Sequence, residues 1–281
     1  MGKIERSWEL VKASWAVLRA DKELLVFPVL SMIAVTIVMA TFAVPLFLSG
    51  ILEGAFVRGG GVPILYVVVA FAFYAVQYTV IFYCNSALVG AAMIRLNGGD
   101  PTLADGFAIA NKRIGSILGY ALLAATVGVI LRNIARRGMI GRIVASVFGL
   151  AWNIATFLAV PVLVVEGVGP IDAVKRSTHL LKKTWGEQIA GNIGIGAAFA
   201  LIFVAGLLPF GAALALAIKV GSVPLIIGVV AAFVVAALLL SLLGSALTAI
   251  YTAAVYRYAT EGEPGGMFAP ALVQDAFRVR S

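Results

Sequence analysis

Few side chains in this sequence combine in a pattern that could do chemistry. The 281 residues include one histidine, His179, and one cysteine, Cys84, so a histidine-based zinc site and an internal disulfide are excluded by count. Long apolar stretches without Asp, Glu, Lys, Arg or His separate the other acids and bases. No general acid, base and nucleophile therefore gather at one depth. We expect no enzymatic activity, no catalytic residue, no metal and no cofactor.

The polar side chains best placed for binding are amides inside the apolar stretches and an acid at the end of one stretch. Amides at membrane depth either bond across helices or contact a solute in a pathway. The acid has similar alternatives, because it can pair with Arg176, cap the next helix or contact a substrate. These candidate pathway or interhelical residues are Gln77, Asn85, Asn153, Asn192 and Glu166.

A second set of candidates combines tryptophan with basic residues in amphipathic segments. In residues 1–23 the apolar residues recur at steps of four and three, as in a helix that lies at the bilayer surface; they are Ile4, Trp8, Val11, Trp15 and Leu18. Residues 171–185 have a similar pattern. Tryptophan favours the headgroup region, and basic residues are attracted to anionic lipid. The candidate lipid or partner contacts are Trp8, Trp15, Arg176, Lys182, Lys183 and Trp185.

The composition predicts that membrane helices position these side chains. Hydrophobic residues make up 62% of the chain and charged residues 12%, and the mean hydropathy is +1.06, which excludes a soluble enzyme and a disordered protein. A helix needs about 20 apolar residues to cross a bilayer. Charge-free stretches long enough, or nearly so, cover 24–52, 59–94, 114–131, 143–165, 188–218 and 220–256. The expected fold class is all-α, a polytopic membrane helix bundle with six spans.

Several of these stretches depart from a simple crossing. Residues 59–94 and 220–256 are longer than one crossing requires, so we expect loops or interfacial turns at their ends, or a strongly tilted helix. Pro161 could kink the fourth stretch. The short stretch 114–131 either crosses, with the arginines of 132–142 at the outer interface, or is re-entrant. Six crossings is the simplest interpretation.

Charge placement predicts the orientation and the partners. The net charge is +8, and with the N-terminus inside, 15 of the 21 Lys and Arg residues lie on the inner side. The positive-inside rule then places both termini in the cytoplasm. We expect the chain in the cell (cytoplasmic, or inner) membrane. We expect membrane lipids as partners, with anionic lipids favoured, and no nucleic acid. A homo-oligomer or a partner membrane protein remains open.

An internal repeat organises the chain. RSWELVKASW at 6–15 and RSTHLLKKTW at 176–185 share Arg, Ser, Leu, Lys and Trp at the same offsets, and each precedes a span. Another inner segment starts with Thr102 and Asp105 at capping-box spacing. We expect an inner-face helix and a hairpin of two spans, repeated three times in one orientation and closed by a terminal helix. Within one membrane domain, 1–281, the units are 1–98, 99–166 and 167–262, with a tail over 263–281.

Two segments carry a resemblance to known proteins: FLAVPVLVVEGVGPIDAVKRSTHLLKKTWGEQIAGNIGIG, from Phe157 to Gly196, and YRYATEGEPGGMFAPALVQDAF, from Tyr256 to Phe277. The first resembles the span, acidic turn and A-x-x-R-S-x-x-L helix of an uncharacterised family of prokaryotic multi-pass membrane proteins. That family is distantly similar to the membrane domain of some glycerophosphodiester phosphodiesterases. No soluble phosphodiesterase domain is present in this sequence, so the resemblance implies a membrane fold without the enzymatic activity.

Two functions follow as expectations. The first is a non-enzymatic integral membrane protein that organises lipid or a partner protein through its basic amphipathic inner-face helices. The repeated tryptophan-bearing helix favours it. The alternative is a channel or transporter for a neutral or lipidic solute, favoured by the amides within the spans and by the glycine-rich stretch 188–218. A polar pathway through the spans would support this alternative, whereas a dry, tightly packed bundle would count against it.

Overall fold

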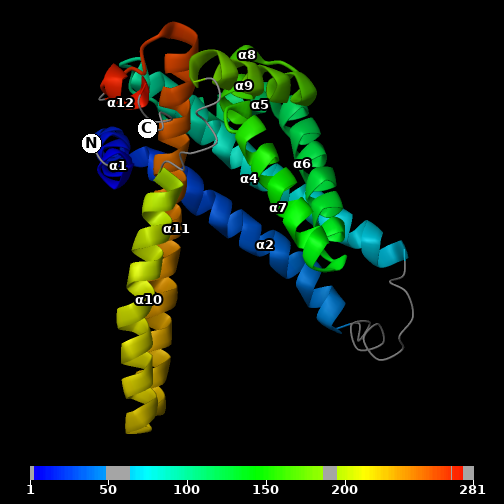
Figure 1. Cartoon of the computed structure of the whole chain (residues 1–281), viewed down its shortest axis with the longest axis vertical. Coiled ribbons are helices and arrows are strands. Elements are labelled where there is room, and N and C mark those ends of the chain that lie inside the picture. The colour runs from blue at the N-terminus through cyan, green and yellow to red at the C-terminus, as the bar shows by residue number, and fades with distance from the viewer. Residues whose placement is uncertain (1–2, 49–63, 186–194, 267, 275–281) are drawn as a thin grey trace.

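The structure is a computed structural model that describes residues 3–48, 64–185, 195–266 and 268–274. Every regular element within these residues is a helix (Figure 1). The elements are α1 (Lys3–Ala20), a short 3-10 helix η1 (Lys22–Leu25), α2 (Val26–Leu48), α4 (Ile64–Leu96), α5 (Leu103–Lys112), α6 (Ile114–Ala135), α7 (Gly138–Ala155), α8 (Ala159–Glu166), α9 (Pro170–Trp185), α10 (Ile195–Val220), α11 (Val223–Glu261) and α12 (Pro270–Gln274).

Six helical segments are long and apolar enough to cross a bilayer, which confirms the predicted all-α bundle with six spans. They are α2, α4, α6, α7 with α8, α10 and α11. The short stretch 114–131 belongs to α6, one uninterrupted helix of 22 residues that is long and apolar enough to cross, which favours the crossing over the re-entrant alternative. The chain is therefore a multi-pass membrane protein.

Four shorter helices, α1, α5, α9 and α12, lie at one end of the molecule, which we call the helical cap (Figure 1). α1, α5 and α9 each precede a pair of spanning segments. α5 begins with the predicted capping box, in which the Asp105 amide donates to Thr102 Oγ1 (3.2 Å) and the Thr102 amide donates to Asp105 Oδ2 (3.0 Å). These bonds satisfy amides that the start of a helix leaves unpaired.

The spanning helices form two arms that diverge away from the helical cap (Figure 1). α10 and α11 run side by side in one arm, and α2, α4, α6 and α7 make up the other. Far from the cap, the α10–α11 arm exposes apolar side chains such as Leu208, Leu216 and Ile227. Lipid is the solvent that suits such a surface.

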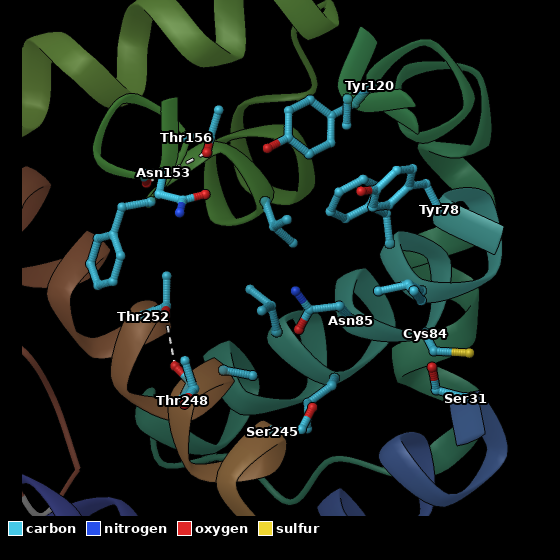
Figure 2. A pocket seen from close by; sticks show the side chains of 18 of the residues that line it. Ser31, Tyr78, Cys84, Asn85, Tyr120, Asn153, Thr156, Ser245, Thr248 and Thr252 are labelled. Carbon is cyan, nitrogen blue, oxygen red and sulfur yellow. Dashed lines mark hydrogen bonds between the residues drawn. The ribbon is translucent and has the colours of Figure 1, made fainter. Parts of the chain in front are cut away.

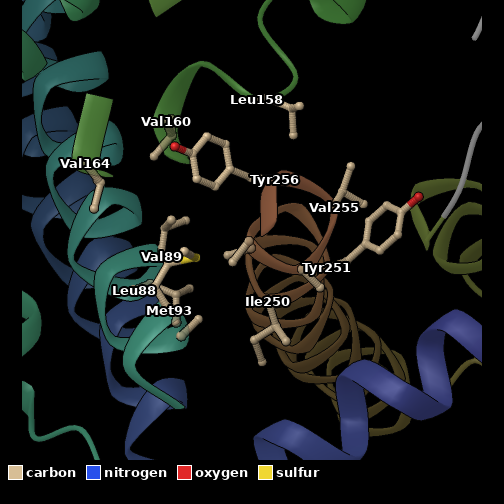
Figure 3. Packing of buried hydrophobic residues seen from close by; sticks show 14 of the residues in the cluster. Leu88, Val89, Met93, Leu158, Val160, Val164, Ile250, Tyr251, Val255 and Tyr256 are labelled. Carbon is tan, nitrogen blue, oxygen red and sulfur yellow. The ribbon is translucent and has the colours of Figure 1, made fainter. Parts of the chain in front are cut away.

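The protein core lies beside the helical cap, where α4, α8 and α11 meet. Figure 3 shows the apolar side chains that converge there, among them Leu88 of α4, Val160 of α8 and Ile250 of α11, and these three belong to one buried cluster. Between spanning helices, close packing of such side chains stabilises the contact through van der Waals attraction. This cluster joins the two arms at the cap.

The two longest charge-free stretches form long continuous helices over the described residues, as the tilted-helix alternative expects, and the stretch 220–256 begins with a turn at residues 221–222. α4 has 33 residues and α11 has 39. At 1.5 Å per residue, α11 is about 58 Å long, nearly twice the hydrocarbon thickness of about 30 Å. Ten residues between Ala246 and Tyr256 are buried, so protein covers the cap-side part of α11.

The fourth charge-free stretch is interrupted at residues 156–158, between α7 and α8. Pro161 has no amide hydrogen to donate to the carbonyl of Phe157, and its ring crowds that carbonyl, which favours the break. The Leu158 amide, left outside both helices, donates to the buried hydroxyl of Ser177 on α9 (N to Oγ 3.0 Å). Ser177 belongs to the repeated RS pair, so the second copy of the repeat holds a spanning segment to the cap.

Candidate ligand-binding cavity

A cavity of about 830 Å³ lies between the two arms, near their junction with the helical cap (Figure 2). Its walls come from α2, α4, α6, α7 and α11, with further lining residues at the α7–α8 break and in α8. Each of the three pairs of spanning segments (α2 with α4, α6 with α7 and α8, α10 with α11) therefore contributes to it. A volume of this size is typical of sites that enclose a small molecule.

Two of the predicted amides project into this cavity from different helices. Asn85 of α4 and Asn153 of α7 both line it, and Figure 2 shows their side chains directed into the open space. Neither side-chain amide has a hydrogen-bond partner among the residues that the structure describes. A polar group in a membrane protein normally finds a partner, because leaving it unpaired costs about 1–3 kcal/mol. These amides are therefore available to water or to a bound molecule.

The wall from α11 carries a stripe of hydroxyl groups. It consists of Ser241, Ser245, Thr248 and Thr252, at steps of four, three and four residues, which places all four on one face of the helix. The Thr252 hydroxyl donates to the Thr248 carbonyl (2.7 Å). Sequence reasoning missed this stripe because it counted only amides, although the spacing is visible in the last charge-free stretch.

The opposite wall combines aromatic rings with the hydroxyls of Tyr78, Tyr120 and Thr156. The rings of Tyr78 and Phe82 stack with centroids 5.7 Å apart, and Phe82 meets Tyr120 of α6 at 4.6 Å. The Tyr120 hydroxyl is directed toward Thr156 at the α7–α8 break (Figure 2). This side of the cavity offers a flat apolar surface with polar atoms at its edge.

No Asp, Glu, Lys, Arg or His is among the described residues that line the cavity. A buried ion would have no compensating charge there, and the desolvation cost would be high. In the described part of the chain no three His, Cys, Asp or Glu side chains come together as a metal site needs. The site is therefore suited to an uncharged molecule that has both polar and apolar parts.

A charged network lies one helical turn beyond the cavity, on the cap side. Arg176 Nε donates to both carboxylate oxygens of Glu166 (3.0 and 3.2 Å), and the Tyr256 hydroxyl donates to Glu166 Oε1 (3.2 Å). Tyr256 follows the cavity residue Thr252 by four positions on α11. The Glu166–Arg176 pair is one of the predicted alternatives, and the network ties α8, α9 and α11 together above the site.

The remaining candidate residues do not join the cavity. Gln77 of α4 is absent from its lining, and the side-chain oxygen of Gln77 is buried without a hydrogen-bond partner in the described regions. Asn192 lies outside the described residues. Trp185 ends α9, and its side chain also lies outside the described part.

The basic and tryptophan candidates lie on the surface of the helical cap. Trp8 and Trp15 of α1 are 48% and 43% exposed. Lys182 and Lys183 of α9 are exposed as well. Arg176 differs from them because Glu166 neutralises it.

One protein family matches the chain: DUF6159, a family of unknown function, over residues 64–266, from the start of α4 to the turns after α11. No curated protein and no solved structure matches. No similarity to glycerophosphodiester phosphodiesterases is shown, so that part of the resemblance lacks support.

Proposed function

This chain belongs to DUF6159, a family of unknown function, and we propose from the cavity that it binds a neutral lipidic solute within the bilayer. One observation carries the proposal. Among the described residues, the side-chain amides of Asn85 and Asn153 have no protein partner, and they project into a cavity of about 830 Å³ that no charged residue lines. This is the site that a carrier of an uncharged amphiphile requires.

The two kinds of wall suit the two parts of such a solute. Hydroxyls of α11 and the two amides can bond a neutral polar headgroup, such as a glycerol or another alcohol. The rings of Tyr78, Phe82 and Tyr120 offer surface for a hydrocarbon chain. An ionised headgroup would enter without a counter-charge and is disfavoured.

The position of the cavity also suits entry from the membrane. α11 belongs to one arm and the other lining spans belong to the second arm, so the cavity lies where the two arms meet. A lipidic molecule dissolved in the bilayer reaches such a site laterally, without passing through water. Transport would then depend on movement of the arms.

The test is photolabelling of the full chain in lipid nanodiscs with a photoreactive monoacylglycerol, compared with a fatty acid anion that carries the same reactive chain. We expect the neutral probe to label α4, α7 and α11. The double variant Asn85→Leu, Asn153→Leu loses two hydrogen bonds to the probe. Its apparent affinity should fall by a factor on the order of ten to a hundred.

The matched control is Asn133→Leu, which removes an exposed amide of α6 that does not line the cavity. This variant should label like the wild-type chain. Equal labelling by the anionic probe, or unchanged labelling of the double variant, would contradict the proposal.

A second function has its own supporting observation at the helical cap. Trp8 and Trp15 are half exposed beside the protein core, where an interfacial ring contacts headgroups, and Lys182 and Lys183 carry unpaired charge among the described residues. Each basic residue near an anionic surface contributes about 1 kcal/mol. We propose that the cap organises anionic lipid on its side of the membrane, and the basic majority of residues on that side favours the cytoplasm.

Reversing two charges tests this second function. We expect Lys182→Glu with Lys183→Glu to reduce the retention of anionic lipid by the purified chain, while monoacylglycerol labelling of the cavity stays unchanged. Retention equal to that of the wild-type chain would count against a lipid-organising cap.

A further inference from the structure

The turn between α6 and α7 carries a concentration of positive charge far from the helical cap. Four exposed arginines lie within eleven residues of the chain; they are Arg132, Arg136, Arg137 and Arg142. We call this segment, residues 132–142, the arginine tip. The sequence has no acidic residue between Asp105 and Glu166, and none of the four arginines has an ion-pair partner in the described regions.

The position of this charge opposes the usual distribution. Basic residues normally gather on one side of a membrane protein, and here most of them lie at the cap side. Because α6 is a continuous spanning helix, the arginine tip lies at the opposite end (Figure 1). Because these four arginines have no acidic partner in the described regions, an anionic partner at this end would stabilise them.

The backbone of the tip adds donors of its own. α7 has 18 residues, and its N-cap residue Arg137 provides no side-chain cap for the first turn. The first amides of such a helix point toward an incoming anion. The turn is also tight, because a side-chain carbon at Gly141 would collide with the carbonyl oxygen of Ile134.

The neighbouring side chains indicate that the partner is a lipid. Met139 and Ile140 are 79% and 78% exposed, and both lie between the arginines. Exposed apolar residues interleaved with basic ones are typical of segments that lie at the bilayer interface. Arg132 lies over the ring of Tyr74, 4.9 Å from its centroid, and this contact leaves the edge of the guanidinium available for bonding.

We propose that the arginine tip binds the phosphate groups of phospholipids in the leaflet opposite the helical cap. The guanidinium groups and the first amides of α7 bond the phosphate oxygens. Met139 and Ile140 enter the adjacent acyl region. This inference is independent of the cavity, and the double variant Asn85→Leu, Asn153→Leu should leave it intact.

The experiment uses the full chain in nanodiscs that contain phosphatidylglycerol with a photoreactive group next to its phosphate. We expect crosslinks within residues 132–147. The triple variant Arg136→Gln, Arg137→Gln, Arg142→Gln should lower the apparent affinity at this segment about a hundredfold, since each cation contributes comparably at an anionic surface. Arg132 is left in place because of its contact with Tyr74.

The matched control removes three charges from the cap, with Lys175→Gln, Lys182→Gln and Lys183→Gln. This variant should keep the crosslinks at the tip. Crosslinks at the tip that persist in the arginine variant would overturn the proposal, as would their removal by dissolved inorganic phosphate, which would identify a free-phosphate site. Replacement of the three arginines by lysine should restore part of the signal, because charge returns without the planar fork.

Discussion

The carboxyl group of Asp21 is buried where α1 ends. Its Oδ1 accepts a hydrogen bond from the Glu23 amide (3.2 Å), while its Oδ2 has no partner among the described residues. Desolvation raises the pKa of Asp21, and the hydrogen bond and the charge of Arg95 only partly oppose it. The folded state therefore binds this proton more tightly than the unfolded state, so ionised Asp21 destabilises the fold. The penalty disappears as the pH falls through the folded-state pKa.

We therefore expect Asp21→Asn to be more stable than the wild-type chain at neutral pH, because Asn keeps the acceptor for Glu23 and carries no charge. Thermal unfolding in detergent measures this difference, which should close toward about pH 4. Asp105→Asn is the control of opposite sign, because the Thr102 hydrogen bonds lower the pKa of Asp105. That variant should be less stable at neutral pH, and its deficit should also close on acidification. A stability change of the same sign in both variants would contradict the raised pKa of Asp21 and the lowered pKa of Asp105.

Sequence reasoning found both cavity amides but could not separate them from Gln77. Seven residues turn a helix by almost two full turns, so Tyr78 lies on the same face of α4 as Asn85. Gln77 is eight residues away, and its direction differs by about 80°. Which face meets the cavity depends on α6, α7 and α11, whose placement the sequence does not state. Hydroxyls are weaker signals still, because many return to a carbonyl of their own helix, as that of Thr252 does.

The hydrogen bond from the Leu158 amide to the Ser177 hydroxyl joins α9 to the break before α8. We expect Ser177→Ala to destabilise the chain by about 1–3 kcal/mol, because it leaves the buried Leu158 amide without a partner. The control is Ser146→Ala, whose exposed hydroxyl donates only to the Arg142 carbonyl of its own helix (2.8 Å). Thermal unfolding in detergent should show a large loss for the first variant and a small one for the second. Similar losses would mean that the contact across the break is unimportant.

α5 packs closely against α2 and α4 at Gly106. A side-chain carbon at Gly106 would lie 2.8 Å from the carbonyl oxygen of Ala87 and 2.5 Å from Phe27 Cζ. Gly106→Ala should therefore destabilise the cap by about 1–3 kcal/mol through overpacking. Gly228→Ala on α11 has no neighbour within 4 Å, so it should be neutral or slightly stabilising. A neutral Gly106→Ala in the same unfolding assay would show that α5 moves away at little cost.

Charge-free stretches and capping signals were enough to predict the elements, but not how the cap helices pack. The expected apolar face of α1 included Trp8, Val11 and Trp15. The structure buries Val11 and Leu18 of the expected face together with Leu10 and Val17, and it leaves both tryptophans half exposed. The apolar surface of α1 is thus divided between protein and bilayer, and periodicity alone cannot divide it. The break before α8 likewise needed Ser177 as well as Pro161.

For the whole molecule, the arginine tip and the helical cap should lie on opposite sides of the membrane. In a Cys84→Ser background, we expect Met139→Cys to react with a membrane-impermeant maleimide in intact cells. Lys182→Cys should react only after permeabilisation, because the basic majority orients the cap toward the cytoplasm. Labelling of both positions from one side would contradict six crossings.

The length of α11 should make the tilt of its arm sensitive to bilayer thickness. Beyond the core, the described part of the α10–α11 arm is little buried against the rest of the protein, so we expect the thickness of the surrounding hydrocarbon to influence its tilt, at a cost of fractions of a kcal/mol per Å of mismatch. Because α11 also forms one cavity wall, a thinner or thicker bilayer should change the distance between Ser245 and Asn153. Spin labels at these two positions, compared in lipids of short and long acyl chains, would measure the change; a constant distance would show that the core alone holds the arm.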